Sequence, residues 1–237
     1  MIPGHRIRTE AMSTRTEPPE EGGGAASAST GPDWLPGLLQ TTDPLFPTGG
    51  YAHSLGLEPW AEATGMAGPE GFAEFLHALV GPSLARAELP YLRALCGAVA
   101  DGDWATVATL DEEVHAWKWS GELRGASLAQ GRGRLRLLDQ MWPEAEVLRD
   151  YHRAAGEGVL RGHHLTVSAL QAVLLAVPVG AALSAYAYQS LANHASAAVK
   201  ILRISAEGAQ RVLRGALERL GEWLEEARGL PVAEAGW

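Results

Sequence analysis

The longest uncharged stretch of the chain, residues 165–199, limits the folds open to it more than any other feature. It reads LTVSALQAVLLAVPVGAALSAYAYQSLANHASAAV and holds no Asp, Glu, Lys or Arg. A helix that is apolar on all sides is either buried in a core or spans a membrane. A span needs about 20 predominantly apolar residues, whereas Pro178 and Gly180 divide this stretch and Gln171 and Gln189 interrupt it. We therefore predict two helices buried on all sides, and any uncovered part of them would be a subunit interface.

The rest of the chain also favours helix. Leu, Ala, Glu and Arg dominate after residue 33, and no stretch alternates strictly between apolar and polar residues, so the predicted fold is an all-α, single-domain bundle of about ten helices. The expected helices cover residues 34–41, 52–65, 69–80, 83–100, 103–119, 122–141, 144–155, 163–176, 178–202 and 205–227. In the last of these, apolar residues recur at three- and four-residue steps from Ala209 to Leu224. This spacing predicts one amphipathic helix, with Ser205 as its N-cap.

The first 33 residues differ in composition from the remainder. They contain Pro3, Pro18, Pro19, the run Gly22-Gly23-Gly24 and few apolar residues. Such a segment cannot offset its ordering entropy, so residues 1–33 are predicted to be a disordered extension of a helical domain at 34–237. No apolar run of the kind found in secretory signals follows Arg6 and Arg8. The single cysteine, Cys96, falls on an apolar helical pattern, which predicts a core thiol and suits a reducing cytoplasm.

The distribution of charge argues against nucleic-acid binding. The formal net charge is −9, and residues 34–120 carry three Lys or Arg against eleven Asp or Glu. A nucleic-acid binder needs a basic face that neutralises phosphates. The one candidate basic patch consists of Arg124, Arg132, Arg134 and Arg136, and it is interpreted as a solvated helix face because charge runs usually face water.

No arrangement of a nucleophile and a base stands out in the sequence. Ser54 follows His53, but neighbours on a helix point about 100° apart. The Gly131-Arg132-Gly133-Arg134 run lacks the lysine of a phosphate-binding loop. Glu112 and His115 have the i, i+3 spacing of di-iron bundles, yet only one copy of the motif is present. The sequence therefore predicts no catalytic residues, no metal site and no cofactor.

The remaining titratable groups support the same interpretation. Metal-site motifs cluster their ligands, whereas His53, His77, His152 and His194 have no partner at ligand spacing, and the adjacent His163 and His164 would splay on a helix. Asp111, Glu112 and Glu113 are interpreted as an exposed acidic turn. The alternative left open is an all-α, metal-dependent enzyme acting on a small apolar or diphosphate substrate through Asp111, Glu112 and His115.

Residues 43–58, DPLFPTGGYAHSLGLE, combine turn chemistry with a helix start. Pro44 and Pro47 disfavour helix before them, and Gly49 and Gly50 permit a tight turn before a helix begins near Ala52. The string resembles the N-terminal signature of the UreF family of urease accessory proteins. Further similarity appears at Glu88-Leu89-Pro90, Tyr186-Ala187-Tyr188, Ser196-Ala197-Ala198-Val199-Lys200 and Gln210. The chain departs from the family pattern at Arg203-Ile204-Ser205, where a Gly-Gln pair is usual, and at Ala233-Glu234-Ala235-Gly236-Trp237, where a basic, aromatic-containing tail is usual.

This resemblance implies a non-catalytic, all-α, dimeric protein of the cytoplasm, without a membrane span. It implies a maturation factor that bridges UreD (also called UreH) and the GTPase UreG on apo-urease and regulates GTP-dependent nickel insertion. On the same basis the partner-binding residues are expected to be Phe46, Pro47, Gly49, Gly50, Tyr51, His53, Glu58 and Lys200. The residues expected at a dimer interface or in the core are Tyr186, Tyr188 and Asn193.

Overall fold

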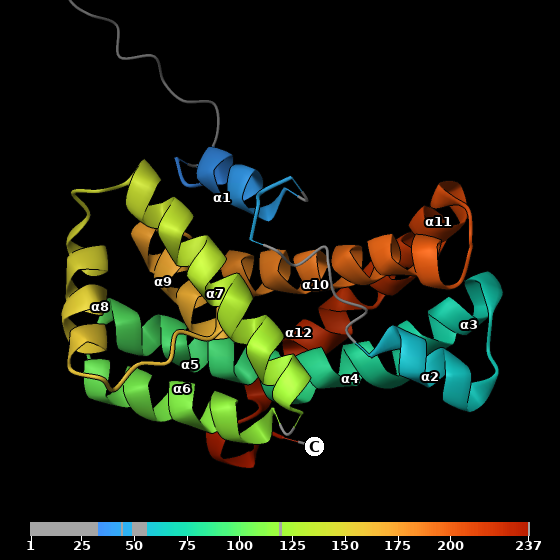
Figure 1. Ribbon diagram of the computed structural model, residues 1–237, viewed down its shortest axis with the longest axis horizontal. Helices are drawn as coiled ribbons and strands as arrows, with labels where there is room; N and C mark the ends of the chain where they lie inside the picture. The colour runs from blue at the N-terminus through green and yellow to red at the C-terminus, as the bar shows by residue number, and fades with distance from the viewer. Residues whose placement is uncertain (1–32, 44, 49–55, 119, 237) are drawn as a thin grey trace, which may run out of the picture. The chain divides into compact units, whose positions relative to one another are not determined.

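The computed structural model describes residues 33–43, 45–48, 56–118 and 120–236, and within these ranges it contains helices and no strand (Figure 1). From Asp33 onward the chain forms one compact unit, so the prediction of an all-α, single-domain bundle is confirmed. The predicted disordered extension lies outside the described residues, apart from Asp33. The helices are α1 (Leu35–Thr42), α2 (Leu57–Thr64), α3 (Gly68–Phe75), α4 (Gly81–Ser83), α5 (Leu89–Ala100), α6 (Trp104–Trp117), α7 (Gly121–Met141), α8 (Glu146–Gly156), α9 (His164–Leu174), α10 (Val179–Ile201), α11 (Ala206–Glu218) and α12 (Leu220–Gly229), with π-turns η2 (Leu76–Val80) and η3 (Leu84–Glu88) and a short 3-10 turn η4 (Val232–Glu234).

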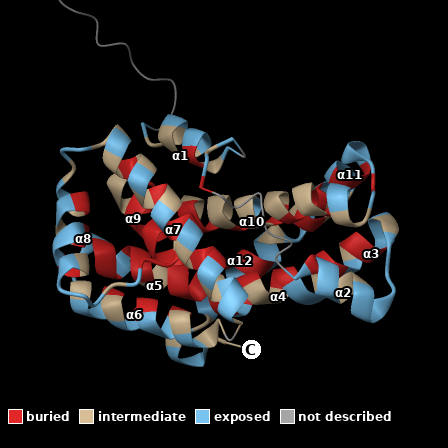
Figure 2. Ribbon diagram, in the orientation of Figure 1, coloured by how far each residue is buried: buried red, intermediate tan, exposed pale blue. Residues whose placement is uncertain are grey.

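Helix α9 is the centre of the core. It packs between α5 and α7, and every residue from Leu165 to Ala172 is buried, as the red ribbon around α5, α7 and α9 shows (Figure 2). The prediction of all-round burial is therefore correct for α9. It is wrong for α10, where Tyr188 is 38% exposed and Val199 is 37% exposed, because the described helices packed on α10 do not cover these two side chains. No helix in the described ranges has the length and apolarity needed to cross a membrane.

The backbone stays helical through Gly81 and Pro82, where the sequence predicts a break between two helices. Pro82 lacks an N–H and would interrupt an α-helix. Here the π-turns η2 and η3 flank α4 and shift the hydrogen-bond register on both sides of the proline. Gly81 also allows a close tertiary contact, since a Cβ at this position would lie 2.2 Å from the Trp223 ring. The continuous helix is thus stabilised by α12, which is distant in sequence.

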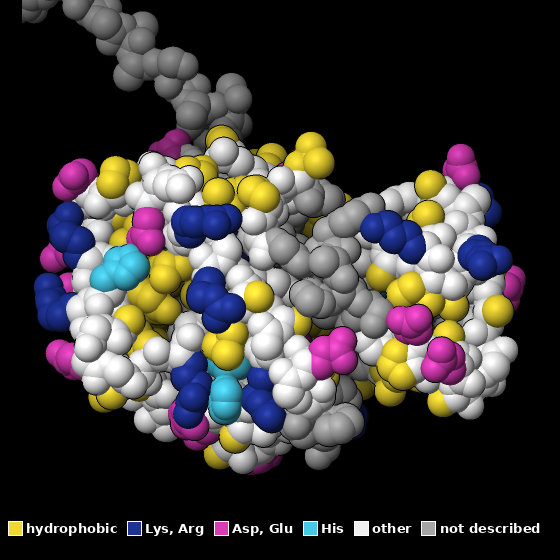
Figure 3. All heavy atoms as spheres, viewed as in Figure 1, with side chains coloured by type: hydrophobic (Ala, Val, Ile, Leu, Met, Phe, Trp, Pro, Cys, Tyr) yellow, Lys and Arg dark blue, Asp and Glu magenta, His cyan; other side chains and the backbone are white. Residues whose placement is uncertain are grey.

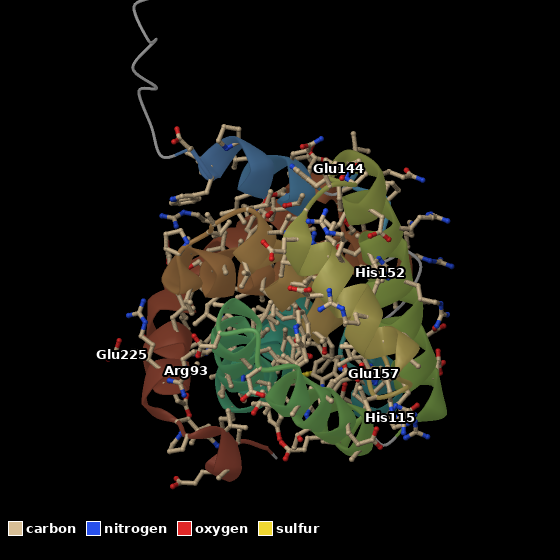
Figure 4. The ribbon with its side chains drawn as sticks, turned by 90° about the vertical axis from the view of Figure 1, so that its left-hand side faces the viewer. Arg93, His115, Glu144, His152, Glu157 and Glu225 are labelled. Carbon is tan, nitrogen blue, oxygen red and sulfur yellow. The ribbon has the colours of Figure 1, made fainter. Side chains whose placement is uncertain are left out.

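The predicted single helix at 205–227 is two helices. Its N-cap is confirmed, because the Ser205 hydroxyl accepts a hydrogen bond from Gly208 N at 3.0 Å. The chain leaves helix at Arg219, so α11 packs on α3 and α10 whereas α12 packs on the π-turn η3. Arg93 of α5, labelled in Figure 4, donates to the carbonyls of Arg228 and Leu230 at the end of α12. The break lets each half of the apolar stripe bury itself against a different neighbour.

Candidate functional site

Asp43 and residues 45–48, called segment 43–48 below, are the first described part of the signature and lie against helix α7. Thr48 is 8% exposed, and a Cβ at Gly133 would lie 2.9 Å from the Thr48 carbonyl oxygen. Asp43 shapes the turn: its Oδ1 accepts from Leu45 N at 2.7 Å and its carbonyl accepts from Phe46 N at 2.9 Å, which is an Asx-type turn. The glycine at position 133 is therefore the feature of α7 that admits this segment.

Arg134 lies directly beneath segment 43–48. Its side chain is 2% exposed, which corrects the interpretation of all four arginines as a solvated face. The guanidinium donates to Gln171 of α9, and to Gln189 Oε1 of α10 at 2.7 Å, and its carbon lies 5.7 Å from the Phe46 ring centroid. The Gln171 amide in turn donates to Thr41 Oγ1 at 2.9 Å. One buried cation thus joins α1, α7, α9, α10 and the signature.

The environment of Arg134 is unusual for a buried charge. Among the described residues no carboxylate contacts it, and its Nε–H has no hydrogen-bond partner. Burial lowers the pKa of the guanidinium to about 10. Buried charges are normally paired because their desolvation is costly. A position at which a folded protein breaks this rule is a candidate functional site.

The signature residues lie at different depths. Leu45 is 88% exposed and Pro47 is exposed, whereas Phe46 is half-buried over Arg134. Glu58 is exposed in the first turn of α2, directly after Gly56, which has φ +89°, and its charge there favours the positive end of the helix dipole. Gly49, Gly50, Tyr51 and His53 lie outside the described residues, as does the predicted start of this helix near Ala52. Lys200 is exposed in the last turn of α10.

A half-open pocket of about 300 Å³ lies between α7, α9, α10 and the continuous helical stretch formed by η2, α4 and η3. Tyr186 and Asn193 line it, so two of the three residues expected at a dimer interface or in the core face this pocket, whereas Tyr188 is on the exposed side of α10. The Tyr186 hydroxyl donates to Glu88 Oε2 at 2.8 Å, and Lys118 Nζ lies 3.9 Å from Glu88 Oε1. Burial raises the pKa of Tyr186 well above its usual value and lowers the pKa of His164 in the wall well below its own. Both groups are therefore neutral near pH 7.

Asp111 is fully buried, which corrects its interpretation as part of an exposed turn. Its carboxylate accepts from the backbone N–H of Arg161 at 2.6 Å, of Gly162 at 2.9 Å and of His163 at 3.2 Å, and from the Thr166 hydroxyl. Arg161 and Gly162 belong to the loop before α9, His163 is the N-cap of α9 and Thr166 is in its first turn, so the carboxylate caps the positive end of the helix together with the loop that enters it. Glu112 pairs instead with Arg161 at the surface. Asp111 and Glu112 thus hold the start of α9, the central helix, in place.

A chain of three side chains runs beside this cap. Ser127 Oγ lies 3.0 Å from His163 Nδ1, and His163 Nε2 lies 3.1 Å from His115 Nδ1. The first pair has the spacing of a nucleophile and its base. However, burial lowers the pKa of His163 to about 4, which makes it a weak base at neutral pH, and the third member is an imidazole where a triad has a carboxylate. No three His, Cys, Asp or Glu side chains of the described ranges are grouped to hold a metal ion.

Sequence reasoning missed Arg134, Asp111 and the His115–His163 contact. The contacts of Asp111 and His115 join residues about fifty positions apart, so no local pattern announces them. The sequence held one weak indication that Arg134 is buried, which is the two glycines just before it, Gly131 and Gly133. A Cβ at Gly131 would lie 2.0 Å from the Gly162 carbonyl oxygen, so both Gly131 and Gly133 mark places where another backbone meets α7.

Comparison with known proteins agrees with the resemblance seen in the signature. The family model UreF matches residues 66–217. A urease accessory protein UreF from Kocuria rhizophila is 31% identical over 196 residues, covering 83% of this chain and 82% of that protein. Another from Azoarcus sp. is 34% identical over 209 residues, covering 83% of each chain, and one from Arthrobacter sp. is 31% identical over 191 residues. The similarity therefore extends across most of the helical unit.

Proposed function

The chain belongs to the UreF family of urease accessory proteins, and on that premise we propose that it is a non-catalytic adaptor. Its role lies in urease maturation, together with other proteins of the accessory complex. In the proposed mechanism it bridges UreD/UreH and the GTPase UreG on apo-urease and regulates GTP-dependent nickel insertion. It does so as a dimer, whose contact uses the exposed, uncharged side of α10 around Tyr188.

The observation that carries the proposal is the way in which segment 43–48 is held. Its inner side is fixed by the backbone contact of Thr48 with Gly133 and by Phe46 over the Arg134 guanidinium. Its outer side presents Leu45 at 88% exposure. A segment that is held on α7 by these contacts and leaves a large apolar side chain in water suits a contact that a partner buries, because binding energy concentrates in such apolar anchors.

The chemistry of the acidic groups supports an adaptor over the alternative of a metal-dependent enzyme. That alternative needs Asp111, Glu112 and His115 to face a common ion. Instead Asp111 caps α9, Glu112 pairs with Arg161, and His115 bonds His163. Each of these three groups already has a structural partner.

The test is reconstitution from purified proteins. We expect immobilised UreD to capture the chain, the pair to recruit UreG, and the assembly to raise GTP-dependent nickel loading of apo-urease. Leu45→Glu and Glu58→Ala should reduce capture and nickel loading without changing the thermal midpoint, because both side chains are exposed. Val159→Glu, a change at a residue 50% exposed in the loop before α9, is the matched control. Metal-dependent turnover by the isolated chain, with no capture by UreD or UreG, would overturn the proposal.

A further inference from the structure

Most exposed arginines of the described chain have a carboxylate partner. The ion pairs are Arg86–Glu226, Arg149–Glu144, Arg153–Asp150, Arg161–Glu112, Arg214–Glu218, Arg219–Glu222 and Arg228–Glu225. Arg132 and Arg136 of α7 are exposed as well. Neither has an ion pair or hydrogen bond to any part of the chain that the structure describes. We call these two residues the basic pair.

The basic pair lies on one face of α7, since residues four apart are neighbours on a helix and like charges there repel. The nearest acid on the same helix, Asp139, is three residues beyond Arg136, but its Oδ1 lies 2.8 Å from His152 Nε2 across the gap to α8. Lys and Arg side chains gather over α7 on the face seen in Figure 3. Two repelling cations without a counter-charge are an arrangement that folding alone does not favour.

The basic pair adjoins segment 43–48. Gly133, which meets the Thr48 carbonyl, projects about 100° around the helix from Arg132 and about 60° from Arg136, whereas Arg134, which underlies Phe46, projects to the buried side. The pair and the segment therefore occupy adjoining sectors of α7 that meet at Gly133, and the segment adds the exposed side chain of Leu45.

We propose that the basic pair and segment 43–48 form one docking surface for a protein partner that presents carboxylates opposite the arginines. The inference rests on the adaptor function proposed above and specifies the chemistry of one partner. Guanidinium groups bind carboxylates through two parallel hydrogen bonds. A protein surface is favoured over nucleic acid because the exposed Leu45 offers an apolar contact, and because the chain carries a net charge of −9 whereas a nucleic-acid binder needs an extended basic face.

The test is charge reversal with a matched control. Arg132→Glu/Arg136→Glu is compared with Arg203→Glu/Arg211→Glu, which makes the same change of charge at two other exposed arginines without ion pairs among the described residues. Immobilised UreD, UreG and apo-urease are probed separately at 50, 150 and 300 mM NaCl. For one of them, we expect reversal at the basic pair to weaken binding by about tenfold or more at the lowest salt and to flatten the salt dependence. Arg132→Lys/Arg136→Lys should bind with an affinity between those of the wild type and the reversed variant, because lysine keeps the charge but cannot make the two parallel hydrogen bonds. The control should stay within about twofold of the wild type.

Other outcomes would overturn the inference, and they separate it from the adaptor function. If the wild-type chain is captured and the reversed variant binds all three proteins equally well, the docking surface is wrong and the adaptor function stands. If none of the three proteins captures the wild-type chain, both proposals fall. A change of sedimentation coefficient on reversal would assign the pair to contact between copies of this chain. If the wild-type chain bound a labelled DNA duplex and the reversed variant did not, the basic pair would be assigned to phosphate binding. Either result would replace the proposed partner.

Discussion

Replacing Gly133 by alanine tests whether α7 holds segment 43–48 in place. A Cβ at this position would lie 2.9 Å from the Thr48 carbonyl oxygen and 3.3 Å from the carbonyl carbon. Both atoms belong to the backbone and cannot rotate away. The segment would therefore have to move outward by roughly 0.5 Å to restore an ordinary contact of 3.4 Å.

The matched control is Gly125→Ala, four residues into the same helix, where a Cβ would meet nothing within 4 Å. Alanine is favoured over glycine inside a helix by about 0.5–1 kcal/mol, so Gly125→Ala should raise the thermal midpoint by about 2–3 °C. Gly133→Ala gains the same propensity but adds a steric cost of about 1–3 kcal/mol. The net result should be a loss of about 1 kcal/mol, so the two substitutions should have opposite signs.

Urea unfolding of both variants gives the sign directly, with an unchanged m-value indicating an intact fold. Hydrogen exchange then locates the effect, because Phe46 N and Thr48 N donate within segment 43–48 at 2.9 Å and 2.8 Å. We expect faster exchange at these two amides in Gly133→Ala alone, together with weaker capture by the accessory proteins. If Gly133→Ala stabilises the chain as much as Gly125→Ala, and leaves both amides protected, the seating of the segment on α7 is refuted.

Three further predictions concern the core. Burial lowers the pKa of His163 from 6.5 to about 4, with Lys118, His115 and Arg161 adding to the effect and Asp111 opposing it. The unfolded chain therefore binds the extra proton between these values, so stability should fall as the pH falls from 6.5 to 4. Urea titrations of His163→Gln should show a loss smaller than that of the wild type by about 1–2 kcal/mol. Asp111→Asn should cost about 2–4 kcal/mol at pH 7, since it disturbs the cap of α9. Glu112→Gln, which removes only an exposed ion pair, should cost much less, and equal losses would refute the capping role. Burial raises the pKa of the Cys96 thiol to about 12, so a disulfide reagent should label it only in denaturant, and fast labelling of the native chain would contradict its core position.

Helices were the part of the fold that the sequence predicted well, because their periodicity is local. The buried stretch at α9 and the cap at Ser205 lie where the pattern indicates. Two boundaries were wrong for reasons that lie elsewhere in the chain. The helix continues through Gly81 because Trp223 packs on it, and the last helix breaks at Arg219 so that its two halves can meet different neighbours.

The candidate site was predictable only where the signature supplied a resemblance. Phe46, Pro47 and Glu58 were identified in this way, and their roles in binding remain predictions. Arg134 and Asp111 were expected in solvent because charged residues are mostly exposed. Both are buried by partners from other helices, Gln171 and Gln189 for the cation and the start of α9 for the anion. Such partners become visible only when the chain has folded.

The contact between Gly133 and Thr48 is made with a main-chain oxygen, which every amino acid carries. The anchoring of segment 43–48 therefore places little demand on the side chains that point away from α7. Substitutions at outward positions such as Leu45 can change the exposed surface of the segment while the attachment stays the same. The attachment of the segment and the chemistry of its outer side can therefore vary independently.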